Sequence, residues 1–104
     1  MPSLFAYALR MDQRCLIAGC GYTGLRLARR LQPRWQVTAL ARSAEAAATL
    51  NAAGIATAPL DLDATVAPGA LAKVADGAAI AYLVPPPDGG TSDPRLERFL
   101  AAVG

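Results

Sequence analysis

Three glycines stand within six positions of one another in "LIAGCGYTGLRLARRL", which covers residues 16–31. A glycine inside a regular element costs roughly 0.5–1 kcal/mol relative to alanine, because its backbone loses more freedom on folding. A cluster of glycines therefore indicates that the backbone itself must come close to another group. Bare main-chain N–H groups at the start of a helix bind anions, phosphate groups in particular. The residues concerned are Gly19, Gly21 and Gly24.

This glycine turn lies between two predicted elements. "CLIAG" is a short apolar run, typical of a strand buried on both faces of a parallel sheet. The helix expected over residues 22–31 has apolar residues on one side and arginines on the other, and Pro33 ends it. A G-x-G-x-x-G motif that leaves a strand and opens a helix is typical of a dinucleotide-binding turn. The alternative is a turn that only joins a strand to a helix.

Each glycine has its own role in the dinucleotide interpretation. Gly19 permits the tight turn, Gly21 lets backbone amides approach a pyrophosphate, and Gly24 lets the helix pack closely on the strand. The pyrophosphate rests at the helix N-terminus, where unpaired amides and the helix dipole favour negative charge. The other residues of the turn complete this part of the predicted cofactor site: Cys20, Tyr22 and Thr23.

The end of the second predicted strand, "WQVTAL", indicates which dinucleotide binds. NAD-binding chains place an acidic residue about twenty positions after the glycines, where it binds the ribose hydroxyls. This chain has Arg42 there, followed by Ser43. A guanidinium pairs with a 2′-phosphate through two hydrogen bonds, and a hydroxyl adds another. NADP is therefore favoured over NAD, with NAD still open. In the alternative, Arg42 is a surface arginine and Ser43 only a helix cap.

Strands and helices alternate along the rest of the chain. Ser43 and Gly54 are typical of the N-cap and the C-terminal end of an alanine-rich helix, and Asp93 with Pro94 is typical of the start of another. Alternating strands and helices predict right-handed crossovers. We therefore expect an α/β fold, a partial Rossmann-type doubly wound parallel sheet of about four strands in the order 3-2-1-4. The further elements expected are a strand over 55–62, a short helix over 71–74 and a strand over 78–84.

Length and composition are those of one compact domain. The 104 residues are 54% hydrophobic and 17% charged, which excludes a disordered chain. We expect residues 1–11 to be a disordered N-terminal extension and residues 12–104 to form the N-terminal half of an NAD(P)-binding Rossmann domain. A formal net charge of +2 is too small to indicate nucleic-acid binding, and no apolar run reaches the length of a membrane span.

The chain has two cysteines, Cys15 and Cys20, and no histidine. This composition argues against a zinc site, a CxxC redox pair and a histidine-based catalytic triad. Free thiols suit a reducing compartment, and the first ten residues lack the basic start of a secretory signal. We therefore expect a cytoplasmic protein whose partner is a small-molecule dinucleotide.

The stretches "AGCGYTG", "VTALARS", "DLD" and "AYLVPPP" resemble the N-terminal half of the extended or atypical short-chain dehydrogenase/reductase superfamily, specifically its NAD(P)-dependent epimerase/dehydratase-like members. The resemblance covers about residues 13–100, less than half of a typical member. The family's glycine turn reads GxxGxxG, which Gly21 and Gly24 match, while Ala18 replaces the first glycine.

The resemblance implies further cofactor contacts. Asp61 and Leu62 match the family's acidic-hydrophobic pair, which lies against adenine. Val84 and Pro85 match positions beside the ribose and nicotinamide. In the alternative, Asp61 is a solvated strand end, Leu62 a core contact and the proline run an ordinary turn. In the cofactor interpretation, the prolines after the fourth strand stiffen the loop, and two later glycines act as its hinge, Gly89 and Gly90.

The superfamily's catalytic tyrosine and lysine, four residues apart, have no match here, since the only lysine, Lys73, has no tyrosine four positions before it. We therefore predict no catalytic residue in this chain. We expect it to be the cofactor-binding portion of an NAD(P)-dependent oxidoreductase, a fragment inactive alone. The alternative is a nonenzymatic NADP-binding regulatory or sensor module. A third interpretation is an unstable product that aggregates through the unpaired edge of the fourth strand. The same edge offers a route to homo-oligomers.

Overall fold

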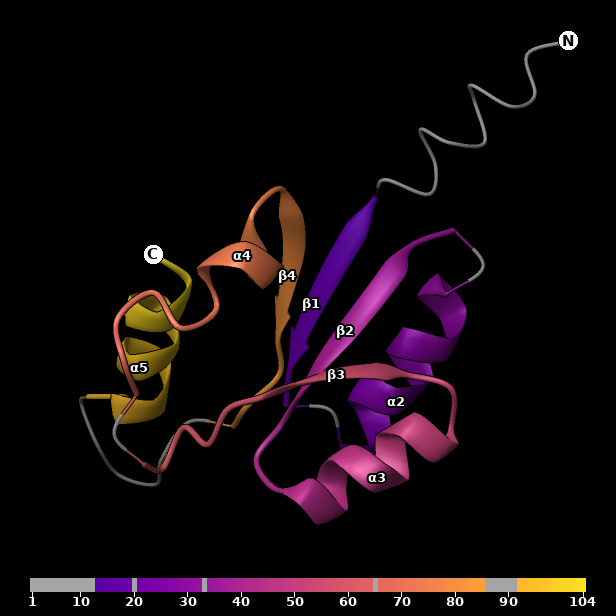
Figure 1. Cartoon of the computed structure of the whole chain (residues 1–104), viewed down its shortest axis with the longest axis horizontal. Coiled ribbons are helices and arrows are strands. Elements are labelled where there is room, and N and C mark those ends of the chain that lie inside the picture. Colours follow the sequence, from indigo (N-terminus) through magenta and orange to yellow (C-terminus); the bar gives the residue numbers. More distant parts are fainter. Residues whose placement is uncertain (1–12, 20, 33, 65, 86–91) are drawn as a thin grey trace, which may run out of the picture.

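The computed structural model describes residues 13–19, 21–32, 34–64, 66–85 and 92–104. Its centre is a parallel sheet with the strand order β3-β2-β1-β4 (Figure 1). This arrangement confirms the predicted Rossmann-like α/β sheet and its order. The predicted extension over 1–11 and the glycine pair at 89 and 90 lie outside the described residues. The strands are β1 (Arg14–Ala18), β2 (Gln36–Ala41), β3 (Ala56–Pro59) and β4 (Ala78–Tyr82).

Helices cover both faces of the sheet (Figure 1). On one face lie α2 (Tyr22–Leu31) and α3 (Ala44–Ala52), and on the other lie α4 (Ala72–Ala75) and α5 (Pro94–Val103). Side chains of β1 alternate between two cores, with Ile17 in the core under α2 and α3 and Leu16 in the core under α4 and α5. Both residues are fully buried, so β1 is the central strand that its apolar sequence predicted.

The predicted helix caps are confirmed. Ser43 Oγ accepts a hydrogen bond from Ala46 N at 3.1 Å and caps α3. Asp93 Oδ1 accepts from Leu96 N at 3.1 Å and caps α5, with proline in the first turn. Gly54 follows α3 with a φ of +82°, a backbone conformation that is unfavourable for residues other than glycine.

Several predicted boundaries are wrong by a few residues. The third strand ends at Pro59 instead of residue 62, because the chain turns where Asp61 Oδ1 accepts a hydrogen bond from Asp63 N at 2.9 Å. The fourth strand ends at Tyr82 instead of residue 84. The first strand ends at Ala18, because Gly19 turns away with a φ of +84°. The second strand and α4 are each shifted one residue toward the C-terminus, to the bounds given above.

Among the described residues, no helix combines the length and apolarity needed to cross a membrane.

Candidate functional site

A cleft of about 880 Å³ lies at the carboxyl ends of the strands. Its volume falls within the roughly 300–1,000 Å³ typical of small-molecule sites. The sequence-predicted residues in its lining come from all four strand ends: Gly19, Gly21, Thr23, Arg42, Ser43, Asp61, Leu62, Val84 and Pro85. The fold therefore brings together residues from four separate stretches of the sequence.

The cleft includes the point where the strand order reverses. From β1 the chain proceeds to β2 and β3 on one side, whereas β4 pairs with β1 on the other. Open parallel sheets bind ligands in the crevice outside the carboxyl ends of the strands at such a switch point. The turn after β1 and the segment after β4 both line the cleft here.

Gly19 is required by the close approach of two backbones. A Cβ atom at this position would lie 2.7 Å from Val84 N and 2.8 Å from the Leu83 carbonyl carbon. The positive φ of Gly19 is a second reason for glycine at this position. Gly19 thus lets the β1 turn pack against the end of β4, and the Gly19 carbonyl accepts a hydrogen bond from Gly21 N at 2.9 Å.

Gly21 is in a different situation, because an added Cβ atom there would meet no atom within 4 Å among the described residues beyond its chain neighbours. This residue is the N-cap of α2, and no side chain caps the helix or places an acidic group in its first turn. The first N–H groups of a helix have no partner within the helix. The start of α2 therefore offers uncapped amides at the cleft.

The remaining residues of the glycine turn differ in position. Thr23 is exposed and lines the cleft. Gly24 is buried in the first turn of α2, away from the cleft lining. Tyr22 begins α2, but its side chain lies outside the described set, as does the whole of Cys20.

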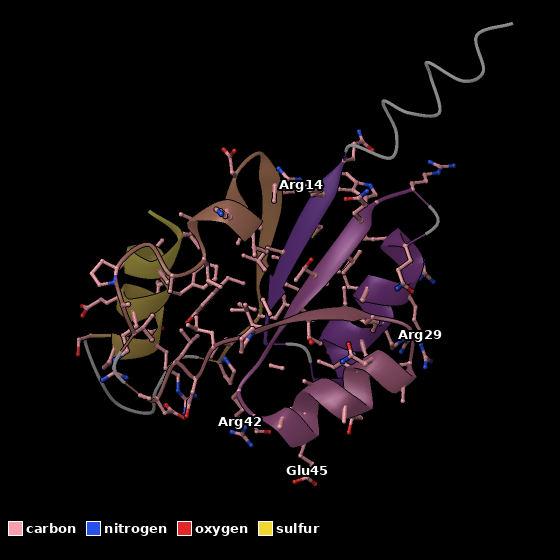
Figure 2. The ribbon with its side chains drawn as sticks, viewed as in Figure 1. Arg14, Arg29, Arg42 and Glu45 are labelled. Atoms are coloured by element: carbon pink, nitrogen blue, oxygen red, sulfur yellow. The ribbon has the colours of Figure 1, made fainter. Side chains whose placement is uncertain are left out.

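Arg42 and Ser43 connect β2 to α3 and are both exposed. In Figure 2, Arg42 lies where β2 leads into α3, at the opposite end of the sheet from Arg14. Within the described part of the chain, the Arg42 side chain makes no hydrogen bond or ion pair. The Ser43 oxygen accepts the capping bond, and its hydroxyl proton can still be donated.

The segment after β3 places a carboxylate and an apolar side chain in the cleft. Asp61 is exposed, and its side chain supports the turn to Asp63. Leu62 is partly buried against the core under α4 and α5, so the core contact considered from the sequence is present as well as the cleft position. Val84 packs against the same core, whereas Pro85 is exposed.

Among the charged residues of the cleft that were not predicted from the sequence, Asp63 and Arg95 form an ion pair. Arg95 Nε donates to Asp63 Oδ1 at 2.7 Å, and Arg95 Nη2 donates to Oδ2 at 3.3 Å. The hydrogen bond from Arg95 lowers the pKa of the Asp63 carboxyl, and the charge of Arg42 lowers it further. The only feature of the sequence that could have indicated this pair is the opposite charge of "DLD" and "DPR". The two residues are 32 positions apart. Only the tertiary fold pairs them.

Comparison of the sequence with models of protein families finds no match, and comparison with curated proteins finds no relative. The likeness to the dehydrogenase/reductase superfamily therefore stays a prediction. Across the described ranges, no group of three histidine, cysteine, aspartate or glutamate residues is placed to hold a metal ion.

Proposed function

We propose that this chain binds a dinucleotide, NADP in preference to NAD, as the cofactor-binding portion of an NADP-dependent epimerase/dehydratase-like oxidoreductase. One observation carries the proposal: among the described residues, the start of α2 at Gly21 has no side-chain cap, and it shares a cleft with Arg42, whose guanidinium makes no hydrogen bond or ion pair there. These are sites for two separate phosphate groups, a pyrophosphate and a 2′-phosphate.

The residues present fit such a cofactor. The space beside Gly21, which a Cβ atom would enter, suits a pyrophosphate on the α2 amides. Arg42 and Ser43 supply donors for a 2′-phosphate, and Asp61 with Leu62 would lie against adenine. Val84 and Pro85 would then border the nicotinamide half. When bound, NADP supplies hydride transfer, while the residues of this chain bind and orient it.

The charges in the cleft favour the 2′-phosphate. The acidic residues in the described lining of the cleft are Glu45, Asp61 and Asp63. Arg95 pairs with Asp63, and Arg42 stands at the position where NAD-binding chains carry a carboxylate. A hydrogen bond to a charged group contributes about 1.5–3 kcal/mol of binding free energy. Arg42 alone should therefore favour NADP over NAD by roughly tenfold or more.

The proposal is tested by measuring the dissociation constants of NADPH and NADH by isothermal titration calorimetry. We expect tighter binding of NADPH, and Arg42→Met should weaken NADPH roughly tenfold or more while leaving NADH nearly unchanged. The matched control is Arg29→Met, because Arg29 is exposed on α2 and outside the cleft lining (Figure 2). Equal binding of the two dinucleotides, or an equal effect of both substitutions, would refute the NADP assignment.

A further inference from the structure

We infer that Arg95 is a specificity-determining residue of the same cleft, since it holds the Asp63 carboxylate away from Arg42 and from a 2′-phosphate. This inference rests on the proposed NADP site. Arg95 does not itself need to touch the cofactor. Its effect on binding passes through the charge of Asp63.

Two arginines of α5 hydrogen-bond to the segment after β3. Arg95 binds both oxygens of the Asp63 carboxylate, at 2.7 and 3.3 Å. One helical turn later, Arg98 Nη1 donates to the Leu62 carbonyl oxygen at 2.7 Å. Arg95 therefore hydrogen-bonds to the charged carboxylate, whereas Arg98 hydrogen-bonds to the backbone and acts on Asp63 only through its charge, after Arg95 and Arg42.

Arg42 lies close enough to Asp63 for its charge to act on the carboxylate. The charge of Arg42 contributes to the lowered pKa of the Asp63 carboxyl, and Arg42, Asp63 and Arg95 line one cleft. Without Arg95, the Asp63 carboxylate would be free to pair with Arg42. Pairing would remove the guanidinium from a 2′-phosphate, and an unpaired carboxylate would also repel the phosphate directly.

The size of the effect follows from exposure. The side chains of Arg95 and Asp63 are 41% and 53% exposed, so water and salt screen their charges. The expected effect on NADPH binding is therefore modest, up to roughly fivefold. The effect should be largest at low ionic strength.

The experiment compares Arg95→Met, Arg98→Met, Asp63→Asn and the double variant Asp63→Asn/Arg95→Met. Dissociation constants for NADPH and NADH are measured at low and high salt, and thermal unfolding confirms that each variant is folded. Arg95→Met should weaken NADPH roughly two- to fivefold at low salt and leave NADH near the wild-type value. The double variant should recover NADPH binding, because the unpaired carboxylate is gone.

Arg98→Met is the matched control for a purely structural role. Arg98→Met removes the hydrogen bond to the Leu62 carbonyl oxygen. In the proposed site Leu62 lies against the adenine of either cofactor, so the dissociation constants of NADPH and NADH should rise together. A cofactor-free readout is the pKa of the Asp63 carboxyl measured by NMR, which should rise toward its ordinary value in Arg95→Met.

Three results would overturn the inference. Arg95→Met weakening NADPH and NADH equally would mean that the ion pair only positions the loop. Failure of the double variant to recover would show that the Asp63 charge is not the cause. An unchanged NADPH preference in Arg95→Met would remove its role while leaving the proposed function intact. Absence of binding to either dinucleotide by the unsubstituted chain, in contrast, would refute the proposed function itself.

Discussion

Gly19 and Gly21 belong to one motif but are needed for different reasons. The backbone of Leu83 and Val84 occupies the space beside Gly19, so its lack of a side chain serves the fold. Beyond its chain neighbours, no atom of the described residues occupies the space beside Gly21, so its lack of a side chain leaves this space open. The motif thus contains one glycine that the close approach of two backbones requires and one that, in the proposed function, leaves room for a phosphate group.

Alanine substitutions should separate these two roles. Gly21→Ala is expected to weaken NADPH binding tenfold or more by filling the phosphate space. It should cost less stability than Gly19→Ala, because the φ of Gly21 is negative and the added Cβ meets no described atom beyond its chain neighbours, although its ψ of −149° lies outside the main regions for alanine. Gly19→Ala should lower the free energy of unfolding by at least about 1–2 kcal/mol, from positive φ and backbone overlap. Urea unfolding and calorimetry measure the two effects. Unchanged NADPH binding by Gly21→Ala would contradict the phosphate assignment.

Asp63 makes the stability of the protein depend on pH. The pKa of its carboxyl is lowered in the folded state, chiefly by the hydrogen bond from Arg95. A lowered folded-state pKa stabilises the fold above the ordinary value of 3.8 and loses that contribution as pH falls below it. Urea midpoints of the unsubstituted chain and Asp63→Asn should therefore differ at pH 6 and converge toward pH 2.5. A constant difference between them would show that the ion pair contributes nothing.

Single residues of the site were predictable to different degrees. Gly21, Arg42 and Asp61 follow strand ends at known spacings, so the sequence placed them near one another once the fold class was assumed. Asp63 and Arg95 were not predictable, because their pairing depends on how α5 sits against the segment after β3. No spacing rule relates two side chains on elements so far apart in sequence.

At the scale of elements, side-chain caps define where α3 and α5 begin. Asp93 accepts the hydrogen bond of Leu96 N, and Pro94 fixes the first turn of α5, next to Arg95. The strand ends were harder to predict, because apolar residues such as Leu60 and Leu83 continue past them. Pro59, which has no N–H to donate, and the turn at Asp61 end β3 instead.

The cap of α5 can be tested by itself. Asp93→Ala should lower the free energy of unfolding by about 0.5–2 kcal/mol, because Leu96 N loses its acceptor. Asp93→Asn is the control, since asparagine caps helices about as well as aspartate. Chemical denaturation of the three proteins provides the comparison. Equal destabilisation by alanine and asparagine would show that the charge of Asp93 matters more than its capping bond.

At the scale of the whole molecule, the two edges of the described sheet differ. The β3 edge is only four residues long and contains Pro59, both of which hinder pairing with another strand. The β4 edge is five residues long, without charge or proline, and Ile80 is 45% exposed there. An uncharged edge with exposed apolar side chains favours strand pairing.

We therefore expect the chain to self-associate through β4 as its concentration rises. Ile80→Lys should shift the sedimentation profile toward the monomer, because a charge at an edge strand opposes pairing. The matched control is Ala56→Lys on the β3 edge, where the residue is also exposed. A strictly monomeric unsubstituted chain, or equal effects of the two lysines, would exclude the β4 edge as the contact.

We propose that the cleft at the strand ends binds NADP through the start of α2 and Arg42. Titration of the ¹⁵N-labelled chain with NADPH, followed by NMR, reports on each of these residues separately. We predict saturable amide shifts concentrated at residues 19–24 and 42–43, with NADH reproducing the first group but not the second. Absence of saturable shifts at residues 19–24 would show that the start of α2 does not bind the cofactor.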